Sequence, residues 1–238
     1  MVEWRWTSPR LDSSITMTRW GEVGTPVLVF PTRSGDAYEI ERNGLVSALG
    51  LLLADRRVKV YSIDDPHRMP AGGDPQAAVA THNLYNDVVI DEVVPMIRED
   101  CHSDDIEIVT AGMAHGTLSA ITVLCRIPDV VAAVVGMSGS YDPSAWLDGE
   151  WSDDVYFVSP LHFVPGMADD EHMDCLRSRF VLLASGTGSG ETPRDTWWLA
   201  DVLGERRIPN RADAWPGWSH GWETWRQMLP GYLHELVS

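Results

Sequence analysis

The chain has 238 residues, a formal net charge of −17 and eleven tryptophans. Its length and its 44% of hydrophobic residues predict one domain with a sizeable core. The charge argues against nucleic acid and against a membrane as partners, because both require a basic face. The sequence contains no apolar run near the roughly 18 residues of a membrane span, and its first residues do not have the pattern of a signal peptide.

The three cysteines form no close pair. An odd number without close spacing argues against a disulfide framework and a zinc ribbon, and predicts a reducing cytoplasm. Neither Asp64-Asp65 nor Asp153-Asp154 has the spacing of a calcium loop, so we expect both pairs to cap loops. The sequence therefore predicts no metal and no cofactor, and it leaves a homo-oligomer open.

Strand-like and helix-like segments alternate along the chain. Strands are predicted, in chain order, at residues 14–19, 26–30, 59–63, 105–110, 130–137 and 180–184, and residues 210–215 are strand-like. Apolar residues at helical spacing predict helices at 37–53 with a break at Asn43-Gly44, 82–98, 115–126, 196–204 and 223–237. This alternation predicts an α/β fold, in which a mostly parallel sheet is covered by helices on both faces.

One segment interrupts the alternation. Residues 139–179 are polar and aromatic at once, and they lie between two predicted strands. A long insertion at the carboxyl edge of a sheet is typical of a lid or cap. We therefore predict a single domain, residues 1–238, that carries this lid.

The most informative motif follows the fourth predicted strand. It reads Gly112-Met113-Ala114-His115-Gly116 and lies at a strand-turn-helix junction. The glycine spacing is that of a nucleophile elbow, Gly-x-Ser-x-Gly, whose tight turn leaves no room for side chains beside the nucleophile. Here the central residue is Ala114, and a methyl group cannot attack a carbonyl. Taken alone, the pentapeptide is more typical of an ordinary strand-turn-helix connection.

Further short blocks accompany this motif. In chain order they are VFPT at 29–32 with SGD at 34–36, DEVVP at 91–95 with IR at 97–98, MSGSYD at 137–142, DDVYF at 153–157 with SP at 159–160, RRIP at 206–209, and HGW at 220–222 followed by Trp225 and MLP at 228–230. With these blocks the sequence resembles the α/β-hydrolase fold from about residue 26 to residue 233. Within that fold it is similar to small bacterial esterases of the esterase D type.

The resemblance implies positions for a catalytic triad. In that family the triad has the chain order Ser, acid, His. The serine position is Ala114, and the histidine is His220, in the loop after the last strand. The acid is expected in the loop 186–193, where Glu191 is the first choice and Asp195, slightly further on, is the second. The alternative role for His220 is to cap the final helix.

The resemblance also implies an oxyanion hole built from backbone amides. One donor is the amide of His115, and the other is expected after the second predicted strand, at Thr32, Arg33 or Ser34. The side chains of His115 and Arg33 depart from the apolar and the small residue of the family, and both could line the pocket. The alternatives are a solvated His115 at the helix start and an ion pair of Arg33 with a nearby carboxylate.

Eight of the tryptophans lie after residue 145. So many near one site predict a large apolar surface, suited to a bulky peptide or an aromatic ester. The tryptophans assigned to substrate binding are Trp146, Trp151, Trp197, Trp218 and Trp222. His82, His162 and His172 lie in polar segments and are predicted to be surface or capping residues.

An elbow without a nucleophile allows three interpretations. The first is a carboxylic ester hydrolase inactivated at Ala114, by engineering or in nature. The further departures at Arg33, His115 and Thr117 argue against a single engineered change. The second is an enzyme in which His220 and the oxyanion hole abstract a proton next to a carbonyl, without a covalent intermediate. The third is a protein that binds a ligand without turnover.

The second interpretation has a further resemblance. In size, in composition and in the loss of the nucleophile, the chain is similar to epimerases of the bottromycin type, which invert an aspartate α-carbon in a ribosomally made, modified peptide. The sequence therefore favours an epimerase, an isomerase of peptide natural-product biosynthesis. Its substrate would be a small molecule or a modified peptide.

Overall fold

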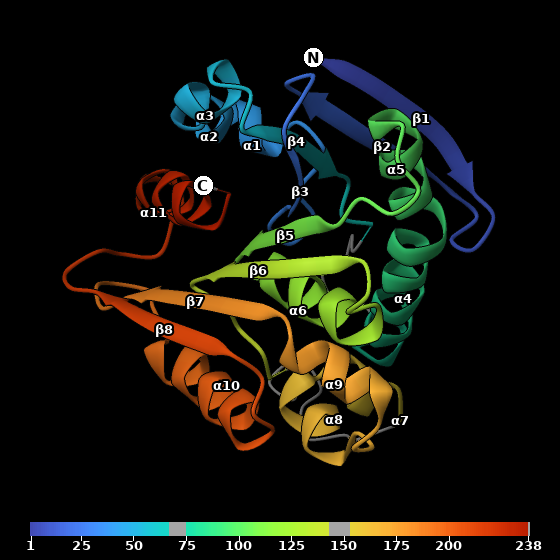
Figure 1. Ribbon diagram of the computed structural model, residues 1–238. Coiled ribbons are helices and arrows are strands. Elements are labelled where there is room, and N and C mark those ends of the chain that lie inside the picture. Colours follow the sequence, from blue (N-terminus) through green and yellow to red (C-terminus); the bar gives the residue numbers. More distant parts are fainter. Residues whose placement is uncertain (67–74, 143–152, 238) are drawn as a thin grey trace.

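A computed structural model describes residues 1–66, 75–142 and 153–237 (Figure 1). Among these residues, eight strands form one sheet in the order β1-β2-β4-β3-β5-β6-β7-β8. The strands are β1 (Val2–Ser8), β2 (Ser13–Trp20), β3 (Thr25–Phe30), β4 (Val58–Ile63), β5 (Ile108–Met113), β6 (Val131–Met137), β7 (Phe180–Gly186) and β8 (Asn210–Trp215). β1 and β2 pair antiparallel, whereas the pairs from β4 through β8 are parallel. The predicted mostly parallel sheet is confirmed.

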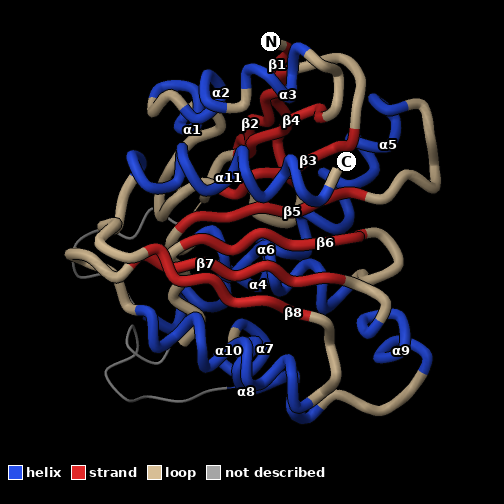
Figure 2. Tube along the Cα trace, turned by 60° about the vertical axis from the view of Figure 1, so that its left-hand side comes forward, coloured by secondary structure: helices blue, strands red, loops and turns tan. Residues whose placement is uncertain are grey.

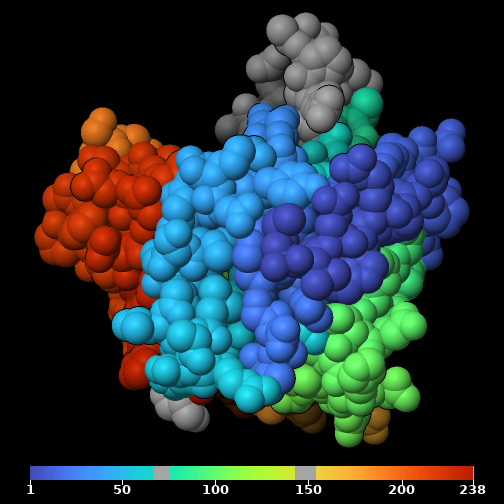
Figure 3. Space-filling view, turned by 90° about the horizontal axis from the view of Figure 1, so that it is seen from above, coloured from blue at the N-terminus to red at the C-terminus, as the bar shows by residue number. Residues whose placement is uncertain are grey.

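Helices cover both faces of this sheet (Figure 2). One face carries α1 (Glu39–Arg42), α2 (Leu45–Ala48), α3 (Gly50–Ala54) and α11 (Trp222–Leu236). The other face carries α4 (Pro75–Val88), the π-helix η1 (Val89–Val93), α5 (Val94–Cys101), α6 (Gly116–Arg126), α8 (Pro160–Gly166), α9 (Glu171–Arg177) and α10 (Pro193–Glu205). Seen from above, α1–α3 in light blue lie between the N-terminal strands and the C-terminal residues (Figure 3). No helix of the described ranges is long and apolar enough to cross a membrane.

Each face of the sheet has its own apolar cluster. Along β3, Leu28 and Phe30 belong to one cluster, whereas Val27 and Val29 belong to the other. Successive side chains of a strand point to opposite faces, so a strand covered on both sides must be apolar throughout. This is why the interior strands β3, β6 and β7 are nearly continuous apolar runs in the sequence, whereas the edge strand β8 is not.

The structure adds one strand that was not predicted and corrects three predicted elements, of which the first is the strand predicted at 105–110, found as β5 at Ile108–Met113. β1 was not predicted, because its inward residues alternate with polar ones: Trp4 and Trp6 are half-buried and Arg5 is exposed. The helix predicted at 82–98 begins at Pro75 and contains the π-helical turn η1. The break predicted at Asn43-Gly44 is present, where Gly44 has a φ of 75°, and a further break follows at Leu49.

The described part of the predicted lid is helical. α7 (Asp153–Val158), α8 and α9 follow one another, and α7 contacts α4 while α8 contacts α6 and α10. Val155 and Val158 of α7 are buried with Val79 of α4 and Leu118 of α6. Trp146 and Trp151 lie outside the described residues, so their place at the substrate stays a prediction, as does the role of the lid.

Candidate active site

The turn after β5 has the shape that an elbow requires. Ala114 has a φ of 48°, in the left-handed region that residues with a Cβ seldom adopt. A Cβ on Gly112 would overlap the backbone of Gly116, and a Cβ on Gly116 would overlap the Pro31 carbonyl oxygen. The Thr117 hydroxyl donates a 2.6 Å hydrogen bond to the Ala114 carbonyl. Both glycines and Thr117 therefore hold the elbow in shape although no serine is present.

The loop that carries His220 is bound to the loop that leaves β7. The His220 amide donates to the Ser189 carbonyl at 3.0 Å, and the Gly188 amide donates to the Trp218 carbonyl at 2.8 Å. A Cβ on Gly186 would overlap that same carbonyl oxygen. The glycine-rich loop thus lets the chain after β8 approach closely, and the two loops run side by side at one end of the sheet (Figure 1).

This approach brings a carboxylate to His220. The Glu191 Oε2 lies 3.7 Å from the His220 Nδ1, which is longer than a hydrogen bond and within range of an ion pair when His220 is protonated. The Glu191 side chain is fully buried, whereas the His220 side chain is 34% exposed. The carboxylate also accepts hydrogen bonds from the Ser138 hydroxyl at 2.7 Å and from the Ser185 hydroxyl at 3.2 Å.

These neighbours keep Glu191 charged. Burial by itself would raise the pKa of Glu191, but His220 and the hydroxyls of Ser138 and Ser185 outweigh it, and the pKa is lowered. Glu191 is therefore a carboxylate at neutral pH, where it can orient the imidazole of His220 and stabilise its protonated form.

Asp195, the second choice for the acid, has different surroundings. Its carboxylate lies 3.7 Å from the Arg194 Nε, near the start of α10. Burial raises the pKa of Asp195, and the charge of Asp142 raises it further. The structure thus brings Glu191, rather than Asp195, to His220.

Ser138 connects the acid to the elbow. Its hydroxyl donates to Glu191 and accepts a 3.0 Å hydrogen bond from the Trp225 Nε1. The preceding residue, Met137, accepts the backbone amide of Ala114 at 3.0 Å. The carboxyl ends of β5 to β8 lie at one edge of the sheet, so these contacts join the elbow and the His220 loop into one site. Ser138 was not assigned a role from the sequence, although its block MSGSYD carried part of the resemblance.

Two of the amides predicted to complete the oxyanion hole are hydrogen-bonded to carboxylates. The Thr32 amide donates to the Glu39 Oε2 at 2.8 Å, and the Ser34 amide donates to the Asp65 Oδ2 at 2.7 Å. In this arrangement neither amide can serve an oxyanion, and the second donor of the oxyanion hole stays a prediction.

The first predicted donor, the His115 amide, lies directly before α6. The amides at a helix start face away from the helix's own carbonyls, and the helix dipole favours negative charge there. The His115 side chain is not solvated, because its ring nitrogens are buried and its ring lies 5.4 Å from that of His82. The prediction that His82 lies at the surface is wrong. His82 is 1% exposed, because α4 begins at Pro75 and places it inside the helix.

Two tryptophans share a hollow with His220, and residues 216–224 are the described residues that line it. Trp218 and Trp222 line a hollow of about 450 Å³ together with His220. The His220 ring meets the Trp225 ring edge to face, with centroids 5.1 Å apart, and Trp222 meets Trp225 in the same way at 5.2 Å. Trp197 is 39% exposed on α10 and is not among the described residues that line this hollow.

Carboxylates elsewhere hold loops. Asp64 accepts the backbone amides of Thr16 at 2.7 Å and Ala37 at 2.9 Å, so the expectation that it caps a loop is met. Within residues 1–66, 75–142 and 153–237, no group of three acidic, histidine or cysteine side chains is arranged to hold a metal ion.

Of the comparisons with known proteins, only the one with solved structures found similar proteins. No protein-family model matches the sequence, and no curated protein matches it. A ferulic acid esterase superposes with a TM-score of 0.76 at 17% identity, over 99% of this chain and 97% of that chain. The S-formylglutathione hydrolase FrmB of Staphylococcus aureus superposes with a TM-score of 0.74 at 15% identity, over 100% and 96%.

An S-formylglutathione hydrolase of Agrobacterium tumefaciens is similar as well, with a TM-score of 0.73 at 13% identity, over 99% of this chain and 95% of that chain. These neighbours are esterase-like hydrolases, and they match nearly the full length of both chains. At such low identity the likeness establishes the architecture and not the reaction. The chain has the α/β-hydrolase fold.

Proposed function

We propose that this protein is a non-hydrolytic enzyme that epimerises an α-carbon next to a carbonyl, with a modified peptide as its substrate. The observation that carries the proposal is the buried Glu191 beside His220 in a site whose residue 114 is alanine. A buried carboxylate costs free energy unless it is paired and hydrogen-bonded. An acid-supported base is needed for proton transfer, whereas a site that only binds a ligand has no use for it.

In the proposed reaction, neutral His220 removes the proton from the α-carbon. The electron pair of the broken C–H bond moves onto the carbonyl oxygen, which becomes an enolate. The His115 amide at the start of α6 stabilises this negative charge, and Glu191 stabilises the imidazolium. The imidazolium of His220 holds the removed proton on one face of the planar carbon. Inversion therefore takes a proton from water on the opposite face, after which His220 releases its own proton to solvent and is neutral again. A carboxylate of the substrate itself is the alternative base, and it would leave His220 to position the substrate.

The surroundings of His220 support a peptide as the substrate. The hollow is lined by Trp218 and Trp222, whose large rings bind apolar groups at low entropic cost. Ala114 leaves no hydroxyl that could form an acyl-enzyme, so the peptide bond next to the enolate is not cleaved. The net charge of −17 makes a strongly anionic substrate unfavourable.

The test is hydrogen exchange at the α-carbon. Short aspartate-containing peptides are incubated with the protein in deuterated water, and their deuterium content and chirality are measured by mass spectrometry and chiral amino-acid analysis. We expect α-deuteration and inversion with the native protein, and a loss of about a hundredfold or more in His220→Ala. Deuteration that is equal with and without the protein would refute the proposal.

A disabled ester hydrolase is the second candidate, and the retained elbow favours it. The φ of 48° at Ala114 is the conformation that would present a nucleophile, and the structural neighbours include esterases. Ala114→Ser distinguishes the two candidates. Hydrolysis of nitrophenyl acetate by this variant, without α-deuteration by the native protein, would establish the disabled hydrolase.

A further inference from the structure

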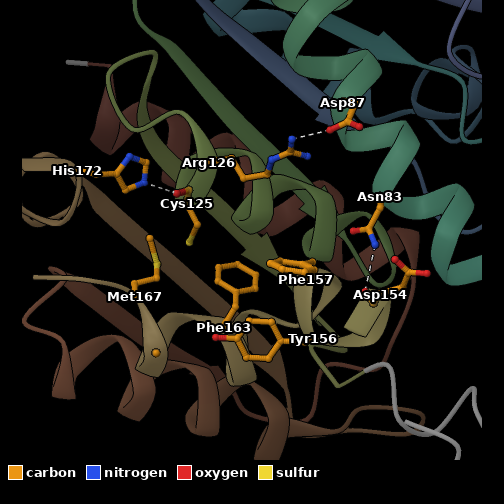
Figure 4. A pocket seen from close by; sticks show the side chains of 11 residues that line it. Asn83, Asp87, Cys125, Arg126, Asp154, Tyr156, Phe157, Phe163, Met167 and His172 are labelled. Carbon is orange, nitrogen blue, oxygen red and sulfur yellow. Dashed lines mark hydrogen bonds and ion pairs between the residues drawn. The ribbon is translucent and has the colours of Figure 1, made fainter. Parts of the chain in front are cut away.

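A second pocket lies apart from His220, among α4, the end of α6, and the helices α7 to α9 (Figure 4). Its volume of about 620 Å³ is within the range of small-molecule sites. Arg126 at the end of α6 lines it, whereas the elbow precedes the start of that helix. Eleven helical residues span roughly 16 Å, so the pocket is one helix length away from the elbow.

The wall of this pocket is aromatic. Tyr156, Phe157, Phe163 and Met167 contribute to it, and the rings of Tyr156 and Phe157 meet edge to face with centroids 5.3 Å apart. Figure 4 shows the three rings and Met167 grouped on one side of the pocket. Phe157 is 59% exposed, which is unusual for a large apolar ring that serves only the core. The wall therefore offers ring faces to an apolar ligand.

The polar rim carries a net negative charge. The Arg126 guanidinium lies 2.5 Å from Asp87, which Arg10 also approaches at 3.8 Å, and Arg10 is in turn paired with Asp91, so these two arginines and two acids balance in charge. The backbone carbonyl of Asp154 accepts the Asn83 side-chain amide at 3.1 Å, and Asp154, an exposed residue, is the remaining acid among those that line the pocket. On the opposite side His172 contacts the Cys125 carbonyl at 2.7 Å. Together with a chain charge of −17, this rim favours a cation over an anion.

We propose that this pocket is a second ligand site, which binds a hydrophobic amine. The apolar body of the ligand lies against Phe163, Met167 and Phe157, and its ammonium group lies near the Asp154 carboxylate. The faces of the aromatic rings attract the same cation through their quadrupoles. The site is independent of His220 and of the reaction proposed for it.

Three probes that share a 2-phenylethyl group test the charge preference. They are 2-phenylethylamine, 2-phenylethanol and 3-phenylpropionate, each titrated into the ¹⁵N-labelled protein and followed by amide chemical shifts. We expect shifts at the end of α6 and in α7 and α8, with the amine binding most tightly and the carboxylate most weakly. Shifts confined to the His220 loop, or a carboxylate that binds as tightly as the amine, would overturn the proposal.

Variants locate the two parts of the site. We expect Asp154→Asn to weaken the amine about fivefold and to leave the alcohol unchanged, since only the charge is removed. Phe157→Ala should weaken both probes, whereas Leu51→Ala, at a residue 81% exposed on α3, is the matched control and should change neither. Equal affinities in Asp154→Asn and the native protein would contradict the assignment of the ammonium group. If the protein forms a concentration-dependent dimer that prevents the probes from binding, the pocket is an interface with a second copy of this chain, and the proposal of a ligand site is overturned.

Discussion

Glu191 is an anion in the interior that three neighbours keep charged. Desolvation disfavours its charge, and the hydrogen bonds of Ser138 and Ser185 together with the proximity of His220 more than offset this cost. Trp225 holds the Ser138 hydroxyl in turn. Glu191 and His220 are thus held by residues outside the turn at Ala114, so their arrangement does not depend on the side chain at residue 114.

The pH dependence of stability tests this charge. The folded-state pKa of Glu191 lies below its ordinary value of 4.5, so its ionisation stabilises the fold above that pH, and the stabilisation is lost as the pH falls through the folded-state pKa. As the pH is lowered from about 5 to about 3, we therefore expect the free energy of unfolding to fall less steeply in Glu191→Gln than in the native protein. Urea unfolding across that range measures it. Glu205→Gln, at an exposed residue of α10, is the control, and equal slopes for both variants would contradict the prediction.

At the scale of elements, the site depends on the loop after β7 and the loop after β8. These loops can lie next to each other because glycines, which have no side chain, stand at their points of contact. The chain after β8 lies so close to the end of β7 that the Trp218 carbonyl occupies the space of a Cβ on Gly186. The β7–β8 register, in which Gly186 pairs with Trp215, places these loops next to each other. The position of His220 therefore follows from strand pairing and from the absence of a side chain, not from its own contacts alone.

Gly186→Ala tests this dependence. The added methyl group must displace the His220 loop, and we expect a loss of about 1–3 kcal/mol in the free energy of unfolding, together with slower α-deuteration. Gly50→Ala is the matched control. Nothing lies within 4 Å of its Cβ position at the start of α3, so alanine should stabilise the protein slightly. Urea unfolding of both variants measures this difference. An unchanged free energy of unfolding in Gly186→Ala would show that the two loops are not tightly fitted.

A buried ion pair joins the antiparallel edge of the sheet to α5. The Asp100 carboxylate lies 2.7 Å from the Lys59 Nζ and 2.8 Å from the Arg19 Nη1, and it accepts the Tyr61 hydroxyl at 2.6 Å. Lys59 is only 3% exposed. Asp100→Asn leaves the Lys59 ammonium without a counter-charge. We expect this variant to lose about 3 kcal/mol of the free energy of unfolding, measured by thermal or urea unfolding. Asp55→Asn, at an exposed residue, should change little, and equal effects would refute the prediction.

For the whole molecule, the net charge of −17 is the dominant electrostatic feature. Like charges repel one another most in the compact state, and salt screens this repulsion over a Debye length of about 10 Å at 0.1 M. We therefore expect the Tm to rise when NaCl is increased from about 10 mM to about 0.3 M. Choline chloride at equal ionic strength controls for specific ion binding. A Tm that falls with both salts would show that the ion pairs outweigh the general repulsion.

Much of the architecture could be predicted because strands covered on both faces must be apolar throughout. β3, an apolar run, was located to within a residue, and the pattern of alternating strands and helices predicted the mostly parallel sheet. The edge strand β8 was also located, although it is not apolar throughout. β1 was not found, since an edge strand needs apolar residues on one side only and alternates Trp4 and Trp6 with polar residues. The burial of His82 was also missed, because the start of α4 carries little apolar periodicity.

The sequence by itself determined that residue 114 cannot be a nucleophile, since the chemistry of a methyl group does not depend on its surroundings. It also determined the fold class, because periodicity is a local property of the chain. Only the tertiary structure decided that Glu191, and not Asp195, meets His220, and that the amides of Thr32 and Ser34 are already bound. These outcomes depend on how loops far apart in the sequence pack at one edge of the sheet, which no local pattern records.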